Sequence, residues 1–145
     1  MRWILILAAL VHLGFMGCEL YPWRVPIALV DVLKGIPPIP VSSDPQVAAE
    51  QQKGIEAREK LAATVVHNAG IYNGIVAGGL FWAAYTGIAG TDLALVMLIG
   101  AVGAGIFGAA TLKPLVPAIQ AVVGIAGVFM VMRAKHQNAK RIVPQ

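Results

Sequence analysis

The chain has 145 residues, of which 58% are hydrophobic and only 12% charged, with a formal net charge of +4. A soluble domain of this length needs about a quarter of its residues charged, so the composition favours a membrane protein. Four of the cations, Arg133, Lys135, Lys140 and Arg141, directly follow an apolar run, which is the usual place of a topology signal. Because basic and aromatic residues do not alternate, nucleic-acid binding is not expected. Cys18 is the only cysteine, which excludes an internal disulfide.

The first apolar stretch, "MRWILILAALVHLGFMGC", imitates a lipoprotein signal peptide through its basic start and its cysteine. Phe15, Met16 and Gly17 precede the cysteine, where such a signal carries a Leu-like residue followed by small residues. We therefore expect a retained transmembrane helix.

Four stretches have the roughly 20 mostly apolar residues that a membrane-spanning helix needs. They cover residues 3–20, 61–85, 93–112 and 115–132. Only Lys113 and Pro114 separate the last two, so these helices should be antiparallel neighbours. The sequence thus predicts one all-α domain over residues 1–145, an integral membrane four-helix bundle.

A long loop over residues 21–60 separates the first two predicted helices and should lie outside the membrane. It begins with "YPW", whose aromatic side chains suit a membrane interface. "VPIALVDVLKG" is too short to span a membrane and predicts a brief interfacial helix. Asp44 and Pro45 predict the start of an amphipathic helix that can run into the second spanning helix, with Gly54 as a weak point.

The charges at both ends predict the topology. The tail over residues 133–145 is basic, and Arg2 lies near the other end. An even number of spanning helices puts both ends on one side, and the positive-inside rule makes that side cytoplasmic. We expect a protein of the bacterial inner membrane with both termini in the cytoplasm.

Small residues recur at four-residue spacing in the predicted helices, which permits close approach of two helix backbones in lipid. This pattern predicts packing faces without requiring any chemistry. Gly87 lies outside these faces and is expected to tolerate a leucine. The predicted packing glycines are Gly70, Gly74, Gly78, Gly100, Gly105, Gly108 and Gly124.

Polar side chains from all four predicted helices fall towards one leaflet, at the level of the long loop. A buried ionisable group costs about 2.5–3.5 kcal/mol at a helix centre, so each such group needs a partner or a function. The candidates are His12, Glu19, His67, Asn68, Tyr72, Asn73, Thr111 and Gln120.

Helical periodicity relates some of these side chains to one another. His12 and Glu19 are seven residues apart, nearly two turns, and therefore share a face. Asn68 and Tyr72 are four residues apart and share a face of the second helix. By the same argument His67 and Asn73 are expected on the flanks of that face.

Several functions are compatible with this set. The polar groups can simply hydrogen-bond across helices. His12 and His67 can ligate haem or a metal, although no short-spaced cluster of His, Cys and carboxylates indicates zinc. His12 and Glu19 can act as an acid–base pair on an apolar substrate, and proton or ion conduction is a fourth possibility. The sequence contains no phosphate-binding loop, dinucleotide fingerprint or nucleophile elbow.

Three stretches, "VHLGFMGCELYPW", "NAGIYNGIVAGGLFW" and "GIFGAAT" with "VPAIQAV", resemble a family of small four-helix membrane proteins catalogued as domain of unknown function 1304. The resemblance implies a fold and a topology but no reaction. Ala69 stands where the family pattern has Gln, and the first loop is longer here. The positions that match the pattern are His12, Glu19, Trp23, Asn68, Gly70, Tyr72, Asn73, Gly74, Thr111 and Gln120.

The sequence therefore favours a small accessory or structural subunit. We expect it to lie in the lipid bilayer and to pack against other membrane proteins or a second copy of itself, with lipid, quinone or pigment between them. The alternative is a membrane enzyme in which His12 and Glu19 are catalytic, and the third possibility is an imidazole-ligated haem or metal protein. No particular cofactor follows from the residues.

Overall fold

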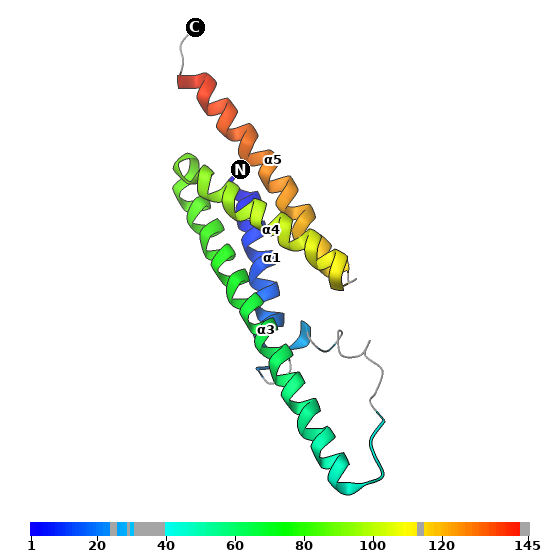
Figure 1. Cartoon of the computed structure of the whole chain (residues 1–145). Coiled ribbons are helices and arrows are strands. Elements are labelled where there is room, and N and C mark those ends of the chain that lie inside the picture. The colour runs from blue at the N-terminus through cyan, green and yellow to red at the C-terminus, as the bar shows by residue number, and fades with distance from the viewer. Residues whose placement is uncertain (24–25, 29, 31–39, 113–114, 143–145) are drawn as a thin grey trace. The chain divides into compact units, whose positions relative to one another are not determined.

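The computed structural model describes residues 1–23, 26–28, 30, 40–112 and 115–142. The helices are α1 (Arg2–Leu20), α3 (Pro45–Thr86), the 3-10 helix η1 (Gly87–Gly90), α4 (Thr91–Leu112) and α5 (Leu115–Ile142) (Figure 1). No residue in these ranges is in a strand, which confirms the all-α prediction for this part of the chain.

Three helical segments of the described chain are long and apolar enough to cross a membrane, by length and composition: Arg2–Leu20, Pro45–Thr111 and Pro117–Arg141. This corrects the prediction of four. The second and third predicted helices belong to one uninterrupted helical stretch, because η1 joins α3 to α4 without a non-helical residue. The chain nevertheless reverses direction at η1 (Figure 1).

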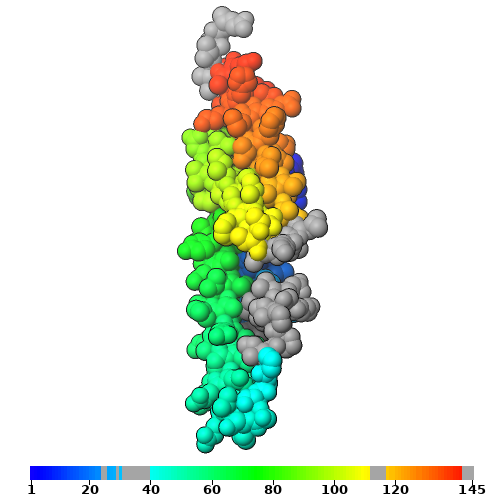
Figure 2. All heavy atoms as spheres, turned by 45° about the vertical axis from the view of Figure 1, so that its right-hand side comes forward, coloured from blue at the N-terminus to red at the C-terminus, as the bar shows by residue number. Residues whose placement is uncertain are grey.

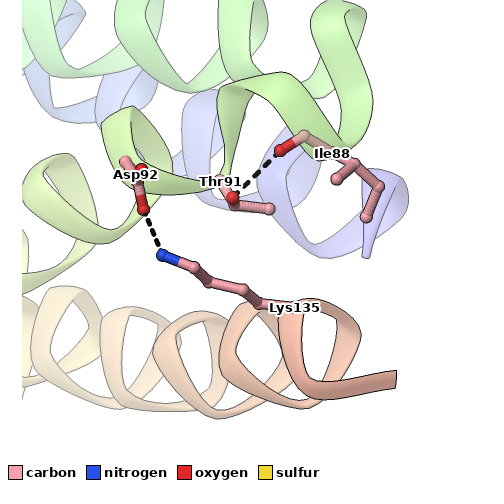
Figure 3. A network of polar contacts seen from close by, with 4 residues as sticks. All are labelled: Ile88, Thr91, Asp92 and Lys135. Atoms are coloured by element: carbon pink, nitrogen blue, oxygen red, sulfur yellow. Dashed lines mark hydrogen bonds and ion pairs between the residues drawn. The ribbon is translucent and has the colours of Figure 1, made fainter. Parts of the chain in front are cut away.

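The reversal begins at Gly87, whose φ of 65° lies in the left-handed region. A side chain in this conformation costs roughly 1–2 kcal/mol, so the expectation that Gly87 tolerates a leucine is wrong. Thr91 then starts α4 and donates a 2.9 Å hydrogen bond from Oγ1 to the carbonyl oxygen of Ile88 (Figure 3).

The start of α3 has the predicted cap. Asp44 Oδ1 accepts a 2.9 Å hydrogen bond from the backbone N–H of Gln46, and Pro45 occupies the first helical position. Gly54 does not interrupt the helix. The predicted loop over residues 21–60 is therefore shorter, because α3 already begins at Pro45. The predicted interfacial helix over residues 25–35 falls mostly outside the described residues, as does the link at Lys113 and Pro114.

The chain divides into two compact units, one formed by Met1–Gly14 with Asn73–Gln145 and the other by Phe15–Tyr72. In the first unit, the core consists of short and branched aliphatic side chains from α1, α3, α4 and α5. The first and last helical residues of this unit, in α1 and α5, lie at the same end of it (Figure 1). The core residues are Leu5, Ala8, Ala9, Ala77, Leu80, Ala83, Ala84, Ala94, Leu98 and Val131.

Glycines bring α4 and α5 into contact. A Cβ on Gly105 would meet the backbone nitrogen of Ala121 and would lie 2.8 Å from the carbonyl oxygen of Pro117. A Cβ on Gly124 would lie 2.7 Å from Cγ2 of Val102. A Cβ on Gly108 would likewise lie 2.8 Å from Cβ of Pro117. An added Cβ at any of these glycines would force a neighbouring atom to shift, and at Gly105 the nearest atoms belong to the backbone.

The other predicted packing glycines differ from one another. Gly70, in the second unit, packs on Leu20, whose Cγ would lie 2.9 Å from an added Cβ. Gly78 and Gly100 face open space, with nothing within 4 Å of an added Cβ. Gly74 is half-buried. Four-residue spacing therefore identified glycine-rich faces but did not indicate which of them pack within the chain.

Candidate polar site

Three buried polar side chains from α1, α3 and α5 meet in the first unit. They are His12, Asn73 and Gln120, with exposed fractions of 3%, 9% and 7%, and we call them the polar cluster. Asn73 Oδ1 lies 2.7 Å from His12 Nδ1 and 2.9 Å from Gln120 Nε2. A single amide oxygen therefore connects three helices.

The hydrogen bonds determine which nitrogen of His12 carries the proton. The carbonyl oxygen of Asn73 can only accept, so the nitrogen that faces it, Nδ1, is the protonated one and donates. Gln120 Nε2 donates to the same oxygen, and its 3.4 Å separation from His12 Nδ1 is then a contact between two donors. In a neutral imidazole of this tautomer, Nε2 has the lone pair.

Local sequence explains why α3 directs Asn73 inward. Ala63, Gly70, Ala77 and Ala84 recur every seven residues and are all buried. Asn73 lies three residues after Gly70 and four before Ala77, so it falls on the same helix face as these small residues. Asn73 therefore lies away from the face that Asn68 and Tyr72 share.

Asn68 and Tyr72 do share a face of α3, but it is the opposite one. The Asn68 side chain is exposed and Tyr72 is 67% exposed, so the structure does not include them in a polar core. The prediction chose the face by its polar residues, whereas the periodic small residues identify the packed side. The spacing of these small residues was therefore the sequence feature that could have identified the inner face of α3.

Thr111 and Glu19 also lie outside the cluster. Thr111 is exposed and donates a 2.8 Å hydrogen bond from Oγ1 to the carbonyl oxygen of Phe107, one turn back in its own helix. Glu19 belongs to the second unit and is half-buried. The described polar contacts of His12 are its hydrogen bond to Asn73 Oδ1 and the 3.4 Å contact of its Nδ1 with Gln120 Nε2. The predicted pairing of His12 with Glu19 is not among them.

His67 lies in the second unit and stacks on an indole. Its ring centroid is 4.0 Å from that of Trp23, with an angle of 9° between the planes. His67 is 9% exposed, and its Nε2 is buried with no hydrogen-bond partner among the described residues. His12 and His67 belong to different units, and the described residues contain no group of three or more potential metal ligands from His, Cys, Asp and Glu.

One ion pair was missed by the sequence reasoning. Lys135 Nζ, on α5, lies 2.5 Å from Asp92 Oδ1, in the first turn of α4 (Figure 3). Both side chains are largely exposed, so the pair contributes little to stability. Its value is geometric, because it aligns residue 135 of α5 with the start of α4.

A family model described as "Protein of unknown function (DUF1304)" matches residues 42–132. No curated protein and no solved structure matches the chain. The matched region contains Asn73 and Gln120 but begins after α1, so it does not include His12.

Proposed function

The chain belongs to the DUF1304 family, and we propose that it is an integral membrane protein that acts as an accessory subunit for other membrane proteins. The helical segments of the described chain that are apolar enough to cross a bilayer support the membrane assignment. Large apolar side chains on their outer faces also support it. Phe107 and Phe129, for example, are 71% and 76% exposed, and such surface needs lipid or another protein to cover it.

The direct contacts inside the polar cluster carry the accessory assignment. His12 and Gln120 both lie within hydrogen-bond distance of one atom of Asn73, so no substrate fits between the three groups. Polar side chains commonly join helices in this way in a bilayer, where unpaired polar groups are costly. The cluster thus has a structural role, while the outer faces remain available for partners.

Mild detergent extraction of the tagged protein from its native membrane tests this proposal. We expect it to elute as a complex larger than the 15.2 kDa chain in its micelle, with defined additional subunits. The matched control is an abundant, unrelated membrane protein with the same tag. A chain that elutes alone under conditions that preserve other complexes would contradict the accessory role.

One observation favours a second candidate, a membrane enzyme acting on a small apolar substrate. Asn73 holds His12 through Nδ1–H, which leaves Nε2 as a base or a ligand atom. Asn73 would then orient the imidazole, and Gln120 would fix Asn73. Only the tautomer of His12, with its proton on Nδ1, supports the enzyme, so this candidate ranks below the accessory role.

The substitution His12→Asn separates the two functions. The asparagine amide can still donate to Asn73, but the lone pair of Nε2 is lost. A structural role predicts that the fold survives with a small loss of stability and unchanged complex formation. An enzymatic role predicts that a copurifying small molecule, detected by mass spectrometry, accumulates or disappears. A Soret absorption band that is lost in this variant would instead support haem ligation, the third possibility.

A further inference from the structure

The outer face of α5 changes from apolar to basic along its length. Its exposed apolar side chains include Ile125, Phe129 and Met132, which are 55%, 76% and 58% exposed. These residues are spaced by four and three, so they share one helix face. The helix continues to Ile142, beyond residue 132, where the sequence predicted that the spanning helix would end.

Three exposed polar side chains extend this same face. Arg133, His136 and Lys140 follow at i, i+3 and i+7, and all are exposed. Phe129 and Arg133 are four residues apart, so the ring and the guanidinium are neighbours on the helix surface. One face therefore presents a ring and then two permanent cations.

Lys135 shows that this arrangement is specific to one face. It lies two residues after Arg133, about 200° around the helix, and points towards Asp92 of α4 (Figure 3). The cations on the outer face have no such partner on their own helix, because Asp92 is the last acidic residue of the sequence.

The position of the pair between Lys135 and Asp92 also marks a boundary. Asp92 lies in the first turn of α4, next to the chain reversal. At the same end, Trp3 is near the start of α1 and Tyr85 near the end of α3, with exposed fractions of 80% and 78%. Exposed aromatic rings at helix ends are typical of a membrane–water interface.

The last part of α5 extends beyond this boundary. Residues 135–142 are helical, and seven further residues correspond to a rise of about 10.5 Å. The end of α5, drawn in red, projects past the reversal between α3 and α4 in both views (Figures 1 and 2). Arg133 and Lys140 therefore bracket the zone that lipid headgroups occupy.

We propose that this face of α5 binds an acidic phospholipid, with its acyl chains along Phe129 and Met132 and its phosphate between Arg133 and Lys140. Charge complementarity identifies the headgroup, and the adjoining apolar side chains identify a lipid rather than free phosphate. An acidic soluble protein or a nucleic acid would leave the apolar part of the face unused. The proposal requires the membrane insertion proposed above but is independent of the accessory role.

Titration of the purified protein with phosphatidylglycerol or phosphatidylcholine, read by native mass spectrometry, tests this proposal. We expect phosphatidylglycerol to bind more tightly. The double substitution Arg133→Gln/Lys140→Gln should reduce its affinity about 25-fold, because each cation near a headgroup contributes about fivefold. Glycerol phosphate, which has the charge without the chains, should not compete at equal concentration.

Two controls remove positive charge elsewhere, and the first of them removes the same number of charges. Arg58→Gln/Lys60→Gln removes two exposed cations from α3, and Lys135→Gln removes one from the other side of α5. Both should retain at least half of the affinity for phosphatidylglycerol. Equal loss in the two double variants, equal binding of both lipids, or competition by glycerol phosphate would overturn the proposal.

Alkaline carbonate extraction distinguishes a failure of the proposed phospholipid site from a failure of the membrane assignment. Protein that stays in the membrane but shows no lipid preference contradicts only the lipid site. Protein that is released by carbonate contradicts membrane insertion itself.

Discussion

Asn73 joins α1 and α5 through one oxygen atom, and its side chain is the centre of the polar cluster. An amide oxygen has two lone pairs, so it can accept from His12 and Gln120 at once. Neither donor can substitute for it. The removal of either donor leaves one bond intact, whereas the removal of Asn73 leaves two buried donors without this acceptor.

We therefore expect Asn73→Ala to be destabilising. The loss should be roughly 1–2 kcal/mol, since hydrogen bonds between helices in membranes contribute about 0.6 kcal/mol on average and buried unpaired donors add to the cost. Thermal unfolding in detergent measures it. Asn68→Ala is the matched control on the same helix, and its exposed side chain predicts a change below about 0.5 kcal/mol. Similar losses in the two variants would show that the cluster contributes nothing specific.

The sequence identified the residue types of the site better than their geometry. His12 and Gln120 were expected to face other helices, and the structure brings them together. Asn68 and Tyr72 were candidates for the same site, but both are exposed. Polarity alone does not indicate the inner face of a helix when most of its surface is apolar, because the usual contrast between a wet and a dry side is absent. The seven-residue spacing of Ala63, Gly70 and Ala77 is the better guide.

At the scale of elements, α4 and α5 pack through glycines that a larger residue cannot replace. Gly105→Ala would place its Cβ against the backbone of Ala121 and Pro117. Backbone atoms cannot move aside as a flexible side chain does, so we expect a loss of roughly 1–3 kcal/mol from overpacking. Circular dichroism during heating in detergent should show a lower midpoint.

Gly100→Ala, on the same helix, should have the opposite effect. Nothing lies within 4 Å of an added Cβ at Gly100. Alanine is a better helix former than glycine by roughly 0.8–1.0 kcal/mol, so the midpoint should stay constant or rise. If both substitutions lower the midpoint equally, a cause common to both sites, such as lipid contact, rather than packing of α4 on α5, determines the response.

Hydropathy predicted where the apolar segments lie but not how far the helices continue beyond them. α3 includes the charged stretch before residue 61, and α5 includes the basic residues after residue 132. Both extensions are rich in Ala, Lys, Arg and Gln, and that of α3 also in Glu, all of which are good helix formers. The run of apolar residues ends where the membrane would end, whereas the helix continues for as long as the residues favour helix. The cap at Asp44 and Pro45 predicted the extension of α3, whereas the extension of α5 would have followed from helix propensity considered separately from hydropathy.

At the scale of the whole molecule, charge and chain direction together predict a topology. The start of α1 and the end of α5 lie at the same end of the first unit (Figure 1), which carries Arg2 and the four cations of the C-terminal segment. By the positive-inside rule, we expect this end to be cytoplasmic. The residues before the spanning part of α3, including Gln52, should then lie on the opposite side.

Labelling with an impermeant maleimide tests this topology in intact cells. In a Cys18→Ser background, which removes the native thiol, Gln137→Cys should react only after the cells are opened, whereas Gln52→Cys should react from outside. Both positions are exposed in the structure, so a difference in reactivity reports the side of the membrane rather than burial. Labelling of Gln137→Cys but not Gln52→Cys in intact cells would invert the topology. The proposed phospholipid site would then lie in the outer leaflet. Reaction of neither site before opening and of both afterwards would place them on the same side, which is incompatible with a spanning α3.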